Sequence, residues 1–160
     1  MMLKVGMAKA FDKLSWDFIK AMLKVFSFRK DWIRWTMSLI SSAFFSILVN
    51  VVPSKCFPPS RGIRQGDPLS PFIFVMVDEG LGRLIKAKIR EGKLKGLRLH
   101  QGSETQSHQK FVDDTLLMAH PAVQEVRELK STLKLFVMAS GMEFNPRKSC
   151  IYFFNTPIIT

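Results

Sequence analysis

The sequence predicts an α+β fold in a single domain. Stretches in which apolar and polar residues alternate are intermixed with stretches whose apolar residues recur every three to four positions, and several connections are short and hairpin-like. Apolar residues make up 47% of the 160 residues, which is enough to bury a core. With only two cysteines, the chain is not a disulfide scaffold, and no repeat or linker divides it.

The first part of the chain predicts a strand, two helices and a β-rich stretch. Leu3 and Val5 alternate with Lys4, which is typical of a half-buried strand. Ser15 is a favourable N-cap directly before an apolar stripe of helical period. The expected elements are a strand over residues 3–7, helices over residues 16–26 and 31–42, and a β-rich stretch over residues 44–52 that ends at a Pro53-Ser54 turn.

The second part predicts two long helices and several short strands. The clearest helix has apolar side chains at helical spacing from Leu69 to Ile85, with a proline suited to its first turn. Its polar face is expected to expose Asp78 and Glu79 to solvent. The remaining expected elements are a short strand at Leu97 and Leu99, a hairpin whose turn carries Asp113 and Asp114, a helix from Pro121 to Gly141, and a strand over residues 151–154.

The chain carries a large excess of positive charge. It has 24 Lys and Arg against 13 Asp and Glu, a net charge of +11, and a pI near 10.0. This charge favours polyanionic partners, with nucleic acid first and an anionic membrane surface second. No apolar run reaches the roughly 20 residues of a membrane helix, and the N-terminus does not resemble a signal peptide. An intracellular protein with reduced thiols and no membrane partner is therefore expected.

Two segments contain the residue types of a catalytic or binding site. Asp113 and Asp114 stand between apolar stretches, where adjacent carboxylates repel each other unless a cation compensates them. Taken alone, the pair fits an ordinary turn better than a metal site, because Asp favours turns by hydrogen-bonding its own backbone. In the basic loop before the clearest helix, Arg61 and Arg64 suit phosphate groups and Gln65 suits a base or sugar edge. A simple lead-in to the helix is the alternative reading of that loop.

Four segments of the chain form an ordered set. They are residues 7–16 (MAKAFDKLSW), 61–71 (RGIRQGDPLSP), 111–114 (FVDD) and 140–149 (SGMEFNPRKS). Together they resemble the palm of reverse transcriptases from non-LTR, LINE-type retrotransposons, and the second segment is highly specific for that family. Because the resemblance covers nearly the whole chain, residues 1–160 are expected to form a partial reverse transcriptase (palm) domain.

The resemblance implies an antiparallel sheet backed by helices and an RNA-directed DNA polymerase that works by two-metal nucleotidyl transfer. It also implies Mg²⁺ (or Mn²⁺) as cofactor, an RNA template, a DNA primer and dNTP as partners, and the nucleus as one compartment. Asp113 and Asp114 would be the catalytic metal ligands. The residues that would contact nucleotide or template are Phe11, Arg61, Arg64, Gln65, Gly66 and Lys148.

Position 6 departs from the family pattern. The family places an aspartate directly before the Met-Ala-Lys-Ala-Phe-Asp run, where this chain has Gly6. Glycine supplies no side-chain oxygen for a hard divalent cation, so the metal ions are expected to bind poorly and this copy to be inactive. Asp12 lies six positions further on and is not expected to substitute.

Other positions also depart from the family pattern, which again favours an inactive copy. Gln109 and Lys110 are polar where the family's strand is usually apolar, and Val51 follows Asn50 where a turn glycine is common. The extent of the chain leads us to expect that fingers and thumb are largely missing.

Three functional hypotheses follow. The first, which Gly6 favours, is an inactive fragment of a retroelement reverse transcriptase. The second is a fragment of the same enzyme that retains catalysis, and the third is a non-enzymatic basic nucleic-acid-binding relic or module. The oligomeric state is left open. The first requires the strand that contains Gly6 to lie beside the acidic turn, on the same side of the sheet.

Overall fold

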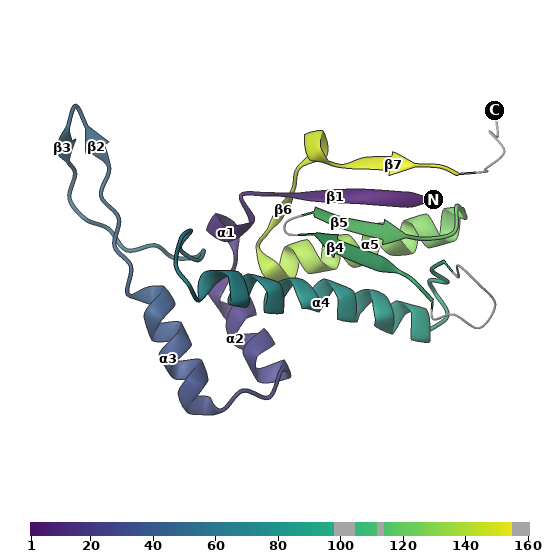
Figure 1. Ribbon diagram of the computed structural model, residues 1–160, viewed down its shortest axis with the longest axis horizontal. Helices are drawn as coiled ribbons and strands as arrows, with labels where there is room; N and C mark the ends of the chain where they lie inside the picture. Colours follow the sequence, from purple (N-terminus) through teal and green to yellow (C-terminus); the bar gives the residue numbers. More distant parts are fainter. Residues whose placement is uncertain (98–104, 112–113, 155–160) are drawn as a thin grey trace.

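The computed structural model describes residues 1–97, 105–111 and 114–154. Strands and helices are intermixed along the chain (Figure 1). In order they are β1 (Met2–Ala8), α1 (Ala10–Lys13), α2 (Trp16–Val25), α3 (Lys30–Ser41), β2 (Leu48–Val49), β3 (Val52–Pro53), α4 (Ser70–Arg90), β4 (His108–Phe111), β5 (Asp114–Met118), α5 (Val123–Ser140), β6 (Glu143–Phe144), the 3₁₀ helix η1 (Pro146–Lys148) and β7 (Cys150–Tyr152).

The main sheet is built around β1. Strand β5 pairs along one side of it and β4 pairs with β5, while β6 and β7 pair with the two ends of its other side. These pairings are all antiparallel, so the predicted α+β class with an antiparallel sheet is confirmed. Val5 and Met7 are buried on the face toward the helices, and alternation turns Lys4 to the opposite face.

Helices α4 and α5 cover one face of the sheet, as expected from their apolar stripes (Figure 1). The stripe of α4 consists of Ile73, Val77, Leu81 and Ile85, each no more than 2% exposed. The two helices are linked where the Lys88 ammonium lies 3.1 Å from the Glu128 carboxylate. The face of the sheet that carries Lys4 is therefore left for other contacts.

The predicted helices and their ends agree closely with the structure. The Ser15 hydroxyl accepts a hydrogen bond from the backbone N–H of Phe18 at 3.4 Å, which confirms the N-cap of α2. Helix α5 ends at Gly141, whose φ of 75° lies in the left-handed region that glycine tolerates. The predicted strand at Leu97 is reduced to a bridge with Gln106, and Leu99 lies outside the described residues.

The β2–β3 hairpin turns at a different place from the predicted Pro53-Ser54 turn. Val49 pairs with Val52, so Asn50 and Val51 form a two-residue loop and Pro53 belongs to β3. A two-residue loop of type I′ needs positive φ at both positions, and the two residues have φ of 49° and 69°. Proline is tolerated here because both strands are short and at the edge.

Asp78 is a second correction. It was expected on the wet face of α4, yet it is only 8% exposed. Strand β4 crosses this part of the helix, and the Lys110 ammonium lies 2.8 Å from the Asp78 carboxylate. Lys110 also donates a hydrogen bond to the Asp78 carbonyl. Lys110 is one of the two polar residues of β4 that depart from the family pattern, and its charge is paired with Asp78 of α4.

Helix α3 and the β2–β3 hairpin extend away from the sheet (Figure 1). Many of their apolar side chains are exposed, among them Trp32, Trp35, Leu39, Phe44, Phe45, Ile47, Leu48, Val49, Val51, Val52 and Phe57. Cys56 and Cys150 are both free thiols. Within the described part of the chain, no helix has the length and apolar character needed to cross a membrane.

Candidate active site

Strand β1 places Gly6 beside the carboxylate hairpin. In the antiparallel pairing of β1 with β5, Gly6 is the direct partner of Asp114. Phe111 pairs with Asp114 across the β4–β5 hairpin, which confirms the predicted hairpin. Asp113 lies outside the described residues. The first strand therefore does run next to the acidic turn.

Asp114 points to the face of the sheet on which a side chain at position 6 would stand. Its carboxylate lies 2.8 Å from the ammonium of Lys4. Lys4 precedes Gly6 by two residues, and alternate residues of a strand share a face. The hydrogen bond from Lys4 to Asp114, assisted by their opposite charges, raises the pKa of the Lys4 ammonium. Of the described residues in this turn, Asp114 is the one acidic side chain, and it is ion-paired with Lys4.

The segment from β6 through η1 to β7 closes over Gly6. The backbone N–H of Gly6 donates to the Ser149 hydroxyl at 3.1 Å, and its carbonyl accepts from the Asn145 N–H at 2.9 Å. A Cβ atom at position 6 would lie 2.6 Å from the Cβ of Lys148. Atoms so near the backbone cannot swing away, so any side chain at position 6 requires η1 to move.

A polar cavity of about 440 Å³ opens beside these residues. Its lining contains three cationic side chains and one carboxylate, together with a serine, a cysteine and a tyrosine: Lys4, Asp114, Arg147, Lys148, Ser149, Cys150 and Tyr152. The described part of this site therefore favours anions over cations. Across residues 1–97, 105–111 and 114–154, no cluster of three or more His, Cys, Asp or Glu side chains could hold a metal ion.

The predicted nucleotide- and template-contacting loop docks on α1. The N–H groups of Gly62 and Ile63 donate at 2.8 Å to the carbonyls of Leu14 and Phe11. Gly62 has a φ of 85°, and a Cβ there would lie 2.6 Å from the Asp12 carbonyl oxygen, so only glycine allows this approach. The contacts fix the predicted loop against the turn that follows β1.

This docking brings Gln65 next to the first predicted motif. The Gln65 amide donates to the Asp12 carboxylate at 3.2 Å, which gives Asp12 a partner in the docked loop. Phe11 stacks on Phe74 of α4 with ring centroids 4.8 Å apart. Arg61, Arg64 and Gly66 lie on the exposed part of the same loop.

The predicted site residues thus form two groups. Gly6, Asp114 and Lys148 meet on the outer face of β1. The loop that carries Arg61, Arg64, Gln65 and Gly66 meets α1, where Ile63 bonds the Phe11 carbonyl and Gln65 bonds Asp12. Sequence reasoning did not identify the pairing of Lys4 with Asp114. The sequence did contain a signal for this pairing, because alternation along the strand places Lys4 on the same face as position 6.

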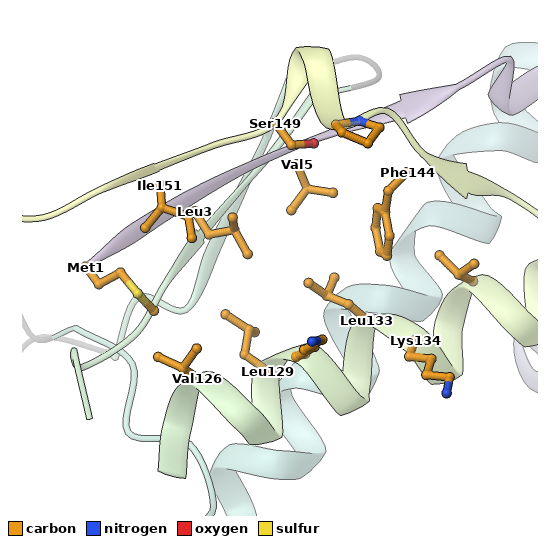
Figure 2. Close-up of a pocket in the computed structure, with 13 residues that line it drawn as sticks. Met1, Leu3, Val5, Val126, Leu129, Leu133, Lys134, Phe144, Ser149 and Ile151 are labelled. Atoms are coloured by element: carbon orange, nitrogen blue, oxygen red, sulfur yellow. The ribbon is translucent and has the colours of Figure 1, made fainter. Parts of the chain in front are cut away.

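An apolar cavity of about 460 Å³ lies on the other face of β1 (Figure 2). Leu3 and Val5 point into it from β1, and Leu129 and Leu133 point into it from α5. This cavity is a gap in the packing between sheet and helix. It lies on the opposite face of the sheet from the polar cavity, and Ser149 lines both cavities.

A family model described as "Reverse transcriptase (RNA-dependent DNA polymerase)" matches residues 1–158. The Pol polyprotein of the Drosophila melanogaster retrotransposable element R2DM is 29% identical over 144 residues, which is 90% of this chain and 13% of that protein. The uncharacterized mitochondrial protein AtMg01250 of Arabidopsis thaliana is 39% identical over 72 residues, 45% of this chain and 59% of that protein. The chain therefore spans less than two thirds of these curated relatives.

Solved structures with the same fold include a telomerase. The telomerase from Candida albicans, solved with a fragment of telomeric RNA, superposes with a TM-score of 0.69 at 14% identity and covers 98% of this chain and 27% of that chain. The telomerase from Candida tropicalis without its C-terminal domain gives 0.66 at 16% identity, covering 98% and 31%. At these identities the likeness shows the fold.

Proposed function

The chain belongs to the reverse transcriptase family, as a region of the LINE-type retroelement enzymes, and on that premise we propose that this copy binds nucleic acid but does not polymerise it. Reverse transcriptases in general use divalent metal ions, and the catalytic step needs carboxylates that hold them. The observation that carries the proposal is Gly6, which faces Asp114 without a side chain and with η1 packed over it.

The charges around Asp114 support the proposal. Two divalent ions bring four positive charges, which several carboxylates must offset. In the described part of the site, Asp114 is held by Lys4, and Arg147 and Lys148 line the same cavity. Like charges a few ångströms apart repel strongly where water is partly excluded. The described residues of the site therefore do not fit a pair of divalent ions, and we interpret Asp113 and Asp114 as the remainder of a metal-binding set.

Asp12 does not restore the missing ligand in this arrangement. Its carboxylate accepts the hydrogen bond from Gln65 in the loop that docks on α1. We assign Gln65 and Phe11, with the exposed Arg61, Arg64 and Gly66, to the side of the domain that would face nucleotide and template. Nucleic acid is the partner that the net charge of +11 favours.

The test is primer extension with the purified chain on an RNA template annealed to a DNA primer, with dNTP and either Mg²⁺ or Mn²⁺. We expect no extended product, because the site lacks the carboxylate at position 6. Asp114→Ala and Asp113→Ala are measured alongside the unchanged chain, since they remove the remaining carboxylates.

Template-dependent extension that disappears in either of these variants would overturn the proposal. Extension that persists in both variants would indicate a contaminating polymerase, and the assay is then repeated with protein purified from a different host until the product is either lost or made dependent on these residues. Nucleic-acid binding is measured on the same samples, so that a misfolded preparation is recognised.

A further inference from the structure

A second basic surface lies between α2 and α3, away from the β1–β5 site. These two helices form a groove of about 550 Å³. Its lining consists of Trp16, Lys20, Lys24, Lys30, Ile33, Arg34, Met37, Ser38 and Ser41. We call this surface the α2–α3 groove. None of its residues belongs to the four segments with family resemblance except Trp16, which ends the first of them.

The cations of the groove form two facing rows. Lys20 and Lys24 are one helical turn apart on α2, and Lys30 and Arg34 are one turn apart on α3. No carboxylate belongs to the lining. Arg34 lies 3.2 Å from the Asp31 carboxylate, but both side chains are more than half exposed, so this ion pair is weak. The charge of the groove is therefore available to an anionic partner.

Apolar and aromatic side chains accompany the cations of the groove. On α3, Ile33 is buried and Met37 is half-buried; on α2, Trp16 is half-buried and lies one helical turn before Lys20. The Trp16 indole N–H donates to the Gly62 carbonyl at 2.7 Å, which fixes the ring in place. A fixed aromatic ring at the end of a row of cations is an arrangement by which proteins bind a single strand of nucleic acid, with a base on the ring and phosphates on the cations.

We propose that the α2–α3 groove binds single-stranded nucleic acid. The phosphates of the strand contact Lys20 and Lys24 on one side and Lys30 and Arg34 on the other, and a base stacks at Trp16. This contact needs no metal ion and no residue of the β1–β5 site. It adds a second nucleic-acid surface to the one that the proposed function places at the palm.

The test compares two double variants that remove the same charge from two helices. Lys20→Ala/Lys24→Ala changes the groove, and Lys130→Ala/Lys134→Ala changes an exposed pair with the same spacing on α5. Binding of a fluorescent oligo(U) and of an oligo(dT) is measured by anisotropy over a salt series in EDTA. We expect the groove variant to bind about tenfold more weakly than the α5 variant, and its salt slope to fall by about 1.4, the value for two phosphate contacts on a single strand.

Tryptophan fluorescence gives an independent readout. The three tryptophans of the chain, Trp16, Trp32 and Trp35, all lie on α2 or α3. We expect either oligonucleotide to quench the fluorescence, and Trp16→Phe to remove most of the quenching. Equal losses of affinity in the two double variants, or quenching unchanged by Trp16→Phe, would overturn the assignment of the groove as a binding site. Nucleic-acid binding by another part of the domain would remain compatible with either result.

A membrane is the competing partner for such a surface. Vesicles of phosphatidylcholine with phosphatidylserine are tested by sedimentation with the same proteins. Vesicle binding that is lost in Lys20→Ala/Lys24→Ala, with oligonucleotide binding retained, would overturn the proposal and assign the groove to an anionic membrane surface. Loss of oligonucleotide binding in that variant alone supports the nucleic-acid assignment.

Discussion

At position 6 the backbone of β1 is held from two directions. The strand pairs with Asp114 on one side, and Ser149 and Asn145 hydrogen-bond the peptide groups of Gly6 on the other. Lys148 lies over the place where a side chain would begin. The packing of η1 therefore leaves no room for a side chain at position 6. An aspartate at this position requires a change in η1 as well as in β1.

We predict that Gly6→Asp destabilises the fold by about 1–3 kcal/mol, the usual effect of forcing extra atoms into a packed site. The reason is the 2.6 Å approach between the new Cβ and that of Lys148. Urea unfolding measures the change. Combining it with Lys148→Gly should recover much of the loss, because that change removes the clashing Cβ. Full stability in Gly6→Asp alone would contradict the closure of η1 over this position.

Asp78 and Asp114 illustrate which residue-scale features the sequence could not reveal. Each carboxylate is paired with a lysine that is far away along the chain, Lys110 for Asp78 and Lys4 for Asp114. Helical or strand periodicity assigns a residue to a face of its own element. It does not say which residue of another element lies opposite, and so the solvated position expected for Asp78 was wrong.

At the scale of elements, the β2–β3 hairpin contains a residue poorly suited to its loop. Val51 has a φ of 69°, and a β-branched side chain in the left-handed region costs about 1–2 kcal/mol. Asn50 also has positive φ, which asparagine tolerates. The sequence flagged this pair as a departure from the family pattern, although it placed the turn three residues too late.

We predict that Val51→Gly stabilises the hairpin locally by about 1 kcal/mol, because glycine adopts positive φ without strain. Amide hydrogen exchange at the Phe45–Phe57 bridge should slow about fivefold, as this free energy implies. Asn50→Gly is the matched control and should change the exchange rate much less. Faster exchange in Val51→Gly would show that the valine stabilises the loop through contacts with neighbours.

Strand β4 contributes a pH-dependent contact with α4. His108 packs against Gly82, and a Cβ at that glycine would lie 2.7 Å from the histidine Nε2. Burial lowers the pKa of His108, and the nearby charges of Lys110 and Lys86 lower it further, outweighing the opposite effects of Glu79 and Asp78. The Ser107 hydroxyl lies 2.9 Å from its Nδ1. The folded state therefore prefers the neutral ring.

We predict that the contribution of His108 to the free energy of unfolding is constant above about pH 7.5 and falls as the pH drops through about 6.5, where His in the unfolded chain takes up a proton first. Because the folded-state pKa is lowered, the stabilising contribution is present at high pH and lost on acidification. His108→Gln should flatten this slope between about pH 7.5 and 5.5. Chemical denaturation at several pH values measures it, and an equally steep slope in the variant would refute the role of His108.

At the scale of the whole molecule, the sequence predicted the sheet and the helices that cover it. It did not predict how tightly these layers pack. Periodicity predicted β1, α2, α3, α4 and α5, because each buries a stripe against a common core. The apolar cavity between β1 and α5 and the exposed apolar side chains of α3 and the β2–β3 hairpin depend on how far elements approach each other. The local sequence of an element does not determine its distance from the neighbouring elements.

The candidate site shows the same division. The ordered segments predicted that β1 would lie beside the acidic hairpin, and the structure agrees for Gly6 and Asp114. The cationic character of the cavity arises only when β1, η1 and β7 come together. A site that resembles a metal centre in its motifs therefore has, in its described residues, the charge of an anion site.

The central claim is that the residues around Gly6 and Asp114 no longer hold divalent metal ions. Its most direct test is a Mn²⁺ titration followed by electron paramagnetic resonance, with the unchanged chain, Asp114→Asn and Asp113→Asn compared at equal concentration. We predict that no Mn²⁺ binds with a dissociation constant below about 1 mM in a manner that depends on either aspartate. Tighter binding that is present in the unchanged chain and abolished by either substitution would contradict the claim.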